Sequence, residues 1–167
     1  NKSGYDFEMV YYNSDGKQGT MCGNGGRCIV AFAKRLGVID KETKFLAADG
    51  EHFANILFEE KYISLVQLAM QNVDEIKKDG NNFFLNTGSP HYVEFRNDVH
   101  LIDVFNEGKN IRYSSRFEKI NGTNVNFVED FGDYIYVRTY ERGVEDETFS
   151  CGTGVTAAAL SFAYNKD

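Results

Sequence analysis

Two short stretches of this sequence place a cysteine directly before a Gly-x-Gly. Residues 21–28 read MCGNGGRC and residues 150–156 read SCGTGVT, so the two cysteines are Cys22 and Cys151. Each motif runs into an apolar stretch of helical length, which predicts a helix that begins at the glycines. A cysteine at a helix N-terminus meets the positive end of the helix dipole and unpaired backbone N–H groups, which favour a thiolate over a thiol. Each motif therefore predicts a base or a nucleophile.

The glycines of both motifs lack side chains, so the backbone N–H groups of the first helical turn can approach an anion such as a carboxylate. If two such sites faced one ligand, their cysteines would lie on opposite sides of a single carbon. One thiolate could then take a proton from one face while the other thiol returned a proton to the opposite face. This arrangement predicts a racemase or an epimerase.

Other kinds of cysteine site fit the sequence less well. A zinc site is disfavoured because Cys22 and Cys28 lack C-x-x-C spacing and the chain has three histidines. We assign Cys28 to the core because it falls inside an apolar helix. A lone G-x-G is weak support for a dinucleotide site, and no lysine stands in a context typical of pyridoxal phosphate. We expect no cofactor and no metal, while a thiol redox protein and a small-ligand-binding module remain as alternatives.

The composition narrows the compartment and the partners. The 167 residues are 42% hydrophobic and 14% aromatic, with a formal net charge of −7 and three cysteines. No apolar run approaches the roughly 20 residues that span a bilayer, and no Lys/Arg cluster suggests nucleic acid. A chain with this small number of cysteines is more typical of reduced thiols in the cytoplasm than of a disulfide framework. We expect a cytoplasmic protein with a small-molecule substrate and no membrane or nucleic-acid partner, and a homodimer is left open.

The two motifs belong to a longer repeat. Shifting the sequence by 129 positions sets Cys22 on Cys151, and with them the glycines, the apolar helices and the strands that come before. This repeat predicts an α+β fold of two pseudo-symmetric lobes, residues 1–70 and 71–167, each a mostly antiparallel β-sheet wrapped around a buried central helix. A long β region follows the first copy and nothing follows the second, so we expect a chain truncated at both ends.

Local patterns predict the individual elements. The polar residues 71–82 are interpreted as a linker, a helix is expected to begin near Leu101, and Gly37 is expected to end the first helix. The expected strands are residues 5–12, 45–58 with a turn at residues 48–52, 62–70, 83–87, 91–96, 124–130 and 133–141.

Four stretches carry a family resemblance. In order along the chain, NSDGKQGTMCGNGGRC, GSPH, GTNVNFVE and YERGVEDETFSCGTG closely resemble diaminopimelate epimerase, a family of cofactor-independent enzymes of lysine and peptidoglycan biosynthesis. The resemblance implies interconversion of LL- and meso-diaminopimelate. Proline and hydroxyproline racemases are the related alternative, but their first motif usually carries His where this chain has Asn24.

The resemblance also implies a role for each site residue. Cys22 and Cys151 would exchange the protons. The substrate's reacting carboxylate would be bound by the backbone N–H groups of Gly23, Asn24, Gly152 and Thr153.

The unreacting end of the substrate would be held by a second group of residues. Arg142 would bind the distal carboxylate as a bidentate fork, with Asn13 and Asn124 as further donors. Glu141 would take the distal ammonium, and Glu141 and His91 would adjust the acidity of the thiols. Taken singly, these residues could instead be a surface ion pair, turn residues and a core histidine.

The chain departs from the family pattern at three points. Ser89 stands where many relatives have Asn, the loop GVEDET is one residue longer, and an early Gly-Asn-Asp-Phe motif is absent. The first two departures concern the part of the site that would bind the distal end of the substrate.

Overall fold

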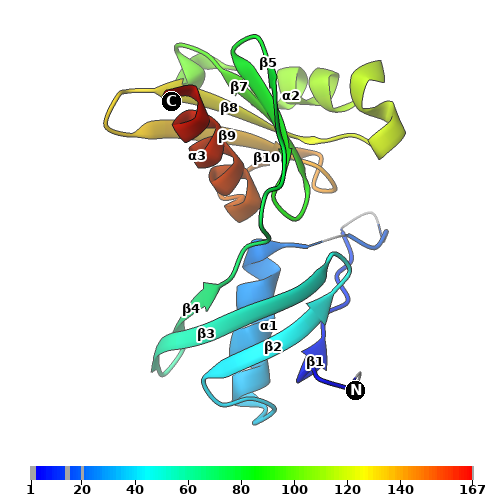
Figure 1. Ribbon diagram of the computed structural model, residues 1–167, viewed down its shortest axis with the longest axis vertical. Helices are drawn as coiled ribbons and strands as arrows, with labels where there is room; N and C mark the ends of the chain where they lie inside the picture. The colour runs from blue at the N-terminus through cyan, green and yellow to red at the C-terminus, as the bar shows by residue number, and fades with distance from the viewer. Residues whose placement is uncertain (1–2, 14–15, 20, 167) are drawn as a thin grey trace. The chain divides into compact units, whose positions relative to one another are not determined.

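The chain divides into two units, Asn1–Gln71 and Asn72–Asp167, and each unit has its own internal contacts. The computed structural model describes residues 3–13, 16–19 and 21–166. Part of the N-terminal motif, residues 14, 15 and 20, therefore lies outside the described residues. Each unit combines one β-sheet with helices (Figure 1), which confirms the predicted α+β class.

The first unit is a four-stranded sheet with one helix packed on it. Its strands run in the order β1-β2-β3-β4; β1 and β2 are parallel and the other pairs are antiparallel. The helix α1 packs on β3 and β4, and the core between them includes Val30, Phe45, Ile56 and Val66. The elements are β1 (Phe7–Glu8), α1 (Gly23–Arg35), β2 (Glu42–Ala47), β3 (Gly50–Glu60) and β4 (Ile63–Leu68).

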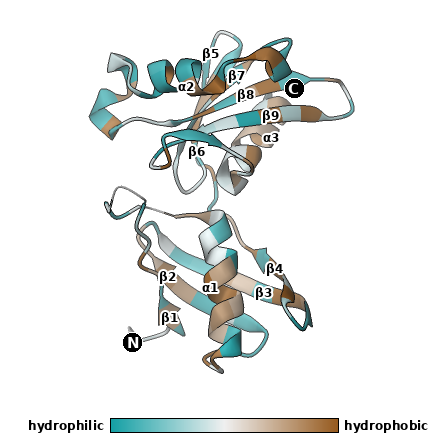
Figure 2. Cartoon of the chain, turned by 180° about the vertical axis from the view of Figure 1, so that it is seen from behind, coloured by the Kyte–Doolittle hydropathy of each residue, from teal (hydrophilic) through white to brown (hydrophobic). Residues whose placement is uncertain are grey.

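Gly37 ends α1 as predicted. Its φ of 69° is left-handed, its N–H donates to the Lys34 carbonyl at 2.9 Å, and the Val38 N–H donates to the Ala33 carbonyl at 3.0 Å. These two bonds form a Schellman motif. Apolar residues recur along α1 (Figure 2), but Phe32 is 59% exposed, so the sheet covers one face of the helix and does not enclose it. Cys28 is also exposed, so its assignment to the core was wrong, because an apolar sequence on all sides of a helix does not show which side the sheet covers.

The second unit is a six-stranded sheet in the order β10-β9-β8-β7-β6-β5. Only the central pair, β7 and β8, is parallel. The elements are β5 (Ile76–Asp79), β6 (Asn82–Asn86), β7 (Pro90–Phe95), the 3-10 helix η1 (Val99–Leu101), α2 (Val104–Arg112), the 3-10 helix η2 (Ser115–Ile120), β8 (Asn124–Asp130), β9 (Ile135–Glu141), β10 (Asp146–Thr148) and α3 (Gly152–Lys166).

The two faces of this sheet carry different helices. Tyr92, Phe127 and Tyr140 belong to the cluster on the α2 face, whereas Val93 and Val128 belong to the cluster on the α3 face. Because successive strand residues point to opposite faces, the neighbours of these side chains can be assigned by alternation. His91, Asn126, Thr139 and Glu141 accordingly share the α3 face.

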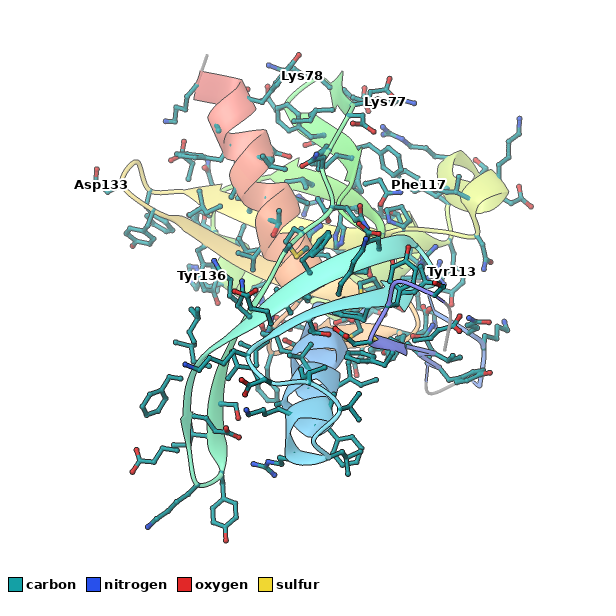
Figure 3. The ribbon with its side chains drawn as sticks, turned by 60° about the horizontal axis from the view of Figure 1, so that its bottom comes forward. Lys77, Lys78, Tyr113, Phe117, Asp133 and Tyr136 are labelled. Atoms are coloured by element: carbon teal, nitrogen blue, oxygen red, sulfur yellow. The ribbon has the colours of Figure 1, made fainter. Side chains whose placement is uncertain are left out.

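Two predictions about this unit were wrong. The polar stretch expected to be a linker contains the edge strand β5, whose Lys77 and Lys78 (Figure 3) hide the strand pattern because an edge strand tolerates charged side chains. The helix expected from Leu101 instead begins at Val104, because Asp103 accepts the Asn106 N–H at 3.1 Å and caps α2. None of the helices in the described part of the chain is long and apolar enough to cross a membrane.

Candidate active site

Cys22 occupies the N-cap position of α1. Its backbone is extended, and its Sγ accepts the Gly25 N–H at 3.3 Å while its carbonyl accepts the Gly26 N–H at 2.7 Å. The first turn contains no acidic residue, so nothing in it opposes an anion. The sulfur therefore lies directly on the N–H groups that open the helix, as the motif predicted.

The other expected residues of this unit are Gly23 and Asn24, in the first turn of α1, and Asn13, which comes before it in the chain. Gly23 is buried, whereas Asn24 is exposed and its side-chain oxygen accepts a hydrogen bond from Arg27. Asn13 follows the bridge between Tyr12 and Gln18, and its N–H donates to the Lys17 carbonyl at 2.9 Å. Gly23 and Asn24 are thus placed beside Cys22, and Asn13 is bonded to Lys17 in the segment that comes before it.

Cys151 stands in the same position before α3, 129 residues later. It is 7% exposed, its carbonyl accepts the Val155 N–H at 2.9 Å, and its Sγ lies 3.4 Å from the Thr153 hydroxyl. A Cβ at Gly154 would lie 2.4 Å from the Asn126 side-chain oxygen. Only glycine at this position lets the start of α3 sit directly on the sheet, so the close approach explains the Gly-x-Gly here.

A buried histidine reaches Cys151 through Thr153. The Asn126 amide nitrogen donates to the Tyr92 carbonyl at 3.1 Å, which fixes its orientation because a carbonyl can only accept. The same nitrogen lies 3.0 Å from His91 Nδ1, so Nδ1 accepts and Nε2 carries the proton. Nε2–H then donates to the Thr153 hydroxyl at 2.9 Å, which leaves the hydroxyl proton of Thr153 to face the Cys151 sulfur.

His91 is neutral in this arrangement. It is fully buried, and this burial lowers its pKa to about 3, with the positive charge of Arg142 acting in the same direction. A neutral imidazole with a fixed tautomer is a permanent hydrogen-bond donor toward Thr153. The network is closed on the other side by Thr139, whose hydroxyl donates to the Asn126 side-chain oxygen at 3.0 Å.

Arg142 lies just after β9 and is half-buried. Its backbone N–H donates to Asn124 Oδ1 at 2.8 Å, and one guanidinium nitrogen lies 3.5 Å from the carbonyls of Ile120 and Gly122. Burial, and then the neighbouring Arg112, lower the pKa of Arg142. Among the described residues, no carboxylate lies within ion-pair distance of Arg142. A half-buried guanidinium in this state is suited to bind an external carboxylate.

Asn124 is used within the unit. Its amide nitrogen donates to the Ser89 hydroxyl at 2.7 Å and to the Pro90 carbonyl at 2.9 Å, and its oxygen holds Arg142. An amide nitrogen has two hydrogens, so Asn124 can donate to a ligand only by releasing one of these partners. Ser89 is 7% exposed, and it supports Asn124 in this structure.

Glu141 is the last residue of β9 and is partly exposed. One of its carboxylate oxygens accepts the Thr148 hydroxyl at 2.9 Å, which links the ends of β9 and β10. Its place on the α3 face of the sheet puts it on the same side as His91 and Thr153.

Several members of this network escaped the sequence patterns. Asn126, Thr139, Arg112 and Glu145 are buried or half-buried polar residues that pair across 13 to 35 positions. The alternation NVN in 124–126 was the one available signal, because it places two amides on the same face of a buried strand. Among the described residues, no group of three His, Cys, Asp or Glu side chains could hold a metal ion.

Comparison with known proteins identifies relatives of the whole chain. The family model for diaminopimelate epimerase matches residues 83–167. The diaminopimelate epimerase of Flavobacterium psychrophilum is 52% identical over 96% of this chain and 61% of that protein. The diaminopimelate epimerase of Chlorobaculum tepidum is 44% identical over 96% of this chain and 64% of that protein. The chain therefore spans less than two thirds of the length of these relatives.

Two solved structures share the fold. A phenazine biosynthesis protein of the PhzF family from Bacillus anthracis matches with a TM-score of 0.71 at 12% identity, over all of this chain and 65% of that chain. A probable proline racemase from Agrobacterium radiobacter K84 matches with a TM-score of 0.72 at 15% identity, over all of this chain and 59% of that chain. At these identities the likeness extends to the fold alone. Because the family model covers more than half of the residues, the chain belongs to the diaminopimelate epimerase family.

Proposed function

We propose that the protein interconverts LL- and meso-diaminopimelate without a cofactor, in the synthesis of lysine and peptidoglycan. The observation that carries this proposal is that Cys22 and Cys151 hold equivalent positions, each before the first glycine of a helix that begins at Gly23 or Gly152. Two sulfurs at two helix N-termini provide two acid/base groups and two sets of backbone donors. This is what inversion at one carbon requires.

In the proposed reaction, one cysteine acts as a thiolate and removes the proton from the α-carbon. The other cysteine, as a thiol, delivers its proton to the opposite face and becomes the thiolate, so that the number of protons on the enzyme is unchanged. The roles exchange when the reaction runs in the other direction. Backbone N–H groups of Gly23, Asn24, Gly152 and Thr153 would stabilise the charge that develops on the carboxylate.

His91 and Thr153 support this role for Cys151. A buried thiolate needs hydrogen-bond donors, and the Thr153 hydroxyl, 3.4 Å from the sulfur, is aimed at it by the neutral His91. When Cys151 is a thiol, the same hydroxyl can accept its proton without a change of partner for His91. The network therefore suits both states of the cysteine. Glu141 is proposed to adjust the acidity of the thiols as well.

The distal end of the substrate is proposed to bind at Arg142. Its guanidinium has no carboxylate partner among the described residues, and its backbone N–H is held by Asn124 Oδ1. Glu141 would take the distal ammonium, and Asn13 would add a donor from the other unit. This pair of opposite charges selects for an amino acid with a second carboxylate and ammonium, and against proline, which has neither.

The proposed compartment is the cytoplasm. No disulfide joins the described cysteines, and a mechanism that depends on two thiols requires a reducing environment.

The decisive experiment follows solvent deuterium into the α-position of diaminopimelate. The full-length gene product, kept reduced in D2O, is incubated with the LL or the meso isomer, and the α-proton signal is followed by NMR. We expect loss of this signal for both isomers, and no loss for proline. Cys22→Ser and Cys151→Ser should each abolish inversion, whereas Cys28→Ser serves as a matched control and should not.

Absence of deuterium incorporation by the wild-type protein would end the proposal. Incorporation into proline at a comparable rate would favour the racemase alternative. If the protein were a thiol redox protein, its thiol chemistry would instead proceed whether or not diaminopimelate is present.

A further inference from the structure

A second arginine lies next to Arg142 and is occupied by an acid. Arg112, the last residue of α2, is only 8% exposed. Its Nε lies 3.0 and 3.1 Å from the two Glu145 carboxylate oxygens, and its Nη2 lies 2.8 Å from one of them. Its Nη1 donates to the Asn121 carbonyl at 2.8 Å. All sides of the guanidinium are therefore engaged.

The fold reserves space for this guanidinium. A Cβ at Gly122 would lie 1.5 Å from Arg112 Nη1, and Gly122 has a left-handed φ of 82°. A side chain at this position would therefore displace Arg112 as well as strain the backbone.

Glu145 belongs to the turn that carries Arg142. Its carboxylate accepts the Gly143 N–H at 2.9 Å, the Tyr113 hydroxyl at 2.8 Å and the Tyr140 hydroxyl at 3.1 Å (Tyr113 is labelled in Figure 3). Burial alone would raise the pKa of Glu145, but the hydrogen bonds from Arg112, Gly143 and Tyr113 outweigh burial and lower it to about 2. Glu145 is therefore a carboxylate at any physiological pH.

The charges around the turn do not cancel. Glu145 bonds the amide of Gly143, the residue next to Arg142, so its carboxylate lies within reach of the Arg142 turn. Yet it pairs with Arg112, so this one carboxylate serves one of the two guanidinium groups. One positive charge is left over, and it resides on Arg142. The half-buried Arg142 therefore has no carboxylate partner among the described residues, while Arg112 occupies the carboxylate of the same turn.

We propose that Arg112 is a positioning residue that holds Glu145 away from Arg142 and so keeps Arg142 free for the distal carboxylate of the substrate. The inference rests on the proposed function and extends it. Arg112 touches neither the substrate nor the cysteines in this scheme; it acts through Glu145. The longer GVEDET loop is what supplies the acid that must be held.

A double-mutant cycle in the full-length gene product separates this role from a purely structural one. Arg112→Gln frees Glu145 to pair with Arg142, and we expect a rise of about tenfold or more in KM for LL-diaminopimelate with a smaller change in kcat, about 1.4 kcal/mol of lost binding. Glu145→Gln removes the competing charge and keeps a side-chain oxygen for Arg112, so its KM should rise less than that of Arg112→Gln. The double variant Arg112→Gln/Glu145→Gln removes the competitor and should recover most of the lost affinity.

The matched control is Arg116→Gln. Arg116 lies four positions after Arg112, in η2, and its guanidinium pairs with the exposed Asp79 at 2.7 Å instead of with Glu145, so the KM of this variant should not change. If Arg112→Gln fails to fold, Arg112→Lys replaces it; this variant keeps the charge but loses the bidentate fork, and a smaller rise in KM is expected.

An NMR measurement makes the outcome independent of turnover. The Arg142 Nε–H signal should shift in Arg112→Gln as Glu145 moves onto it, and it should return to the wild-type position in the double variant. A double variant as impaired as Arg112→Gln, or an Arg142 signal that does not respond, would overturn the inference. Wild-type protein without epimerase activity would instead overturn the proposed function, and the Arg142 signal would still decide the role of Arg112.

Discussion

Removing one hydroxyl, in Thr153→Val, tests the path from His91 to Cys151. The substitution keeps the shape of the side chain and the backbone N–H proposed to bind the substrate carboxylate. It removes the 3.4 Å contact to the Cys151 sulfur and the 2.9 Å contact that accepts the His91 proton. We therefore expect kcat to fall while KM stays within a factor of about two, because KM depends on contacts that the variant retains.

The size of the effect follows from the two contacts. A hydrogen bond to a charged group contributes about 1.5–3 kcal/mol, and the long sulfur contact places this one at the lower end, so kcat should fall about tenfold. Leaving the buried His91 N–H without an acceptor costs about 1–3 kcal/mol of folding free energy. The Ser89 hydroxyl, 3.3 Å from the same nitrogen, should keep this cost near the lower bound.

The assay is deuterium exchange at the α-carbon from each isomer, together with urea unfolding. Thr156→Val is the matched control: it removes a hydroxyl one turn further along α3 that bonds only the Gly152 carbonyl, at 3.0 Å. Thr153→Ser should restore activity because it restores the hydroxyl. Equal kcat losses in Thr153→Val and Thr156→Val, or a kcat for Thr153→Val within twofold of the wild type, would refute the proposed path.

Two further predictions concern the same network. His91 has a pKa of about 3 in the folded protein, below its unfolded value, so its contribution to stability is complete above pH 6.5. This contribution is lost as the pH falls, at up to about 1.4 kcal/mol per pH unit. Urea unfolding of the wild type and of His91→Gln between pH 7 and 5 should show this slope in the wild type only. Gly154→Ala should destabilise the protein by about 1–3 kcal/mol because its Cβ would meet the Asn126 oxygen at 2.4 Å, whereas Gly25→Ala meets the mobile end of Met9 at 3.2 Å and should cost less.

Clear outcomes would contradict these two predictions. A slope between pH 7 and 5 that persists in His91→Gln would place its origin in other groups. The window between pH 7 and 5 separates His91 from Glu145. The pKa of Glu145 in the folded protein is about 2, so its contribution to folding stability is lost only below pH 4.5. Equal destabilisation by Gly154→Ala and Gly25→Ala would show that the sheet yields to the added methyl.

Local signals predicted the elements that carry the chemistry. Both helices begin at the predicted glycines, Gly23 and Gly152, because the cysteine and glycine residues at a helix start act within one turn. The hairpin of β8 and β9 was predicted because its alternation and its turn, FGD, are continuous in sequence. These features need no information from distant parts of the chain.

The supporting network could not be predicted in this way. Arg112 and Glu145 meet across 33 positions and the Asn126 and His91 side chains across 35, and neither pair has a periodicity that marks it. A sequence pattern could place His91 near the site only through the family resemblance. Its tautomer and its neutral state follow from the Tyr92 carbonyl and from burial, which appear only once the strands are aligned.

The repeat is therefore a repeat of backbone and cysteine, and its side-chain environments differ. Cys151 is 7% exposed, and its sulfur lies against the Thr153 hydroxyl, which His91 orients by a hydrogen bond. Cys22 is partly exposed, and its sulfur accepts a hydrogen bond from the Gly25 backbone N–H. A backbone donor cannot be changed by a side-chain substitution, but a hydroxyl can. A substitution next to one sulfur should accordingly affect the proton transfer by that cysteine alone. In Thr153→Val, the deuterium exchange rates measured from the LL and meso isomers should therefore differ.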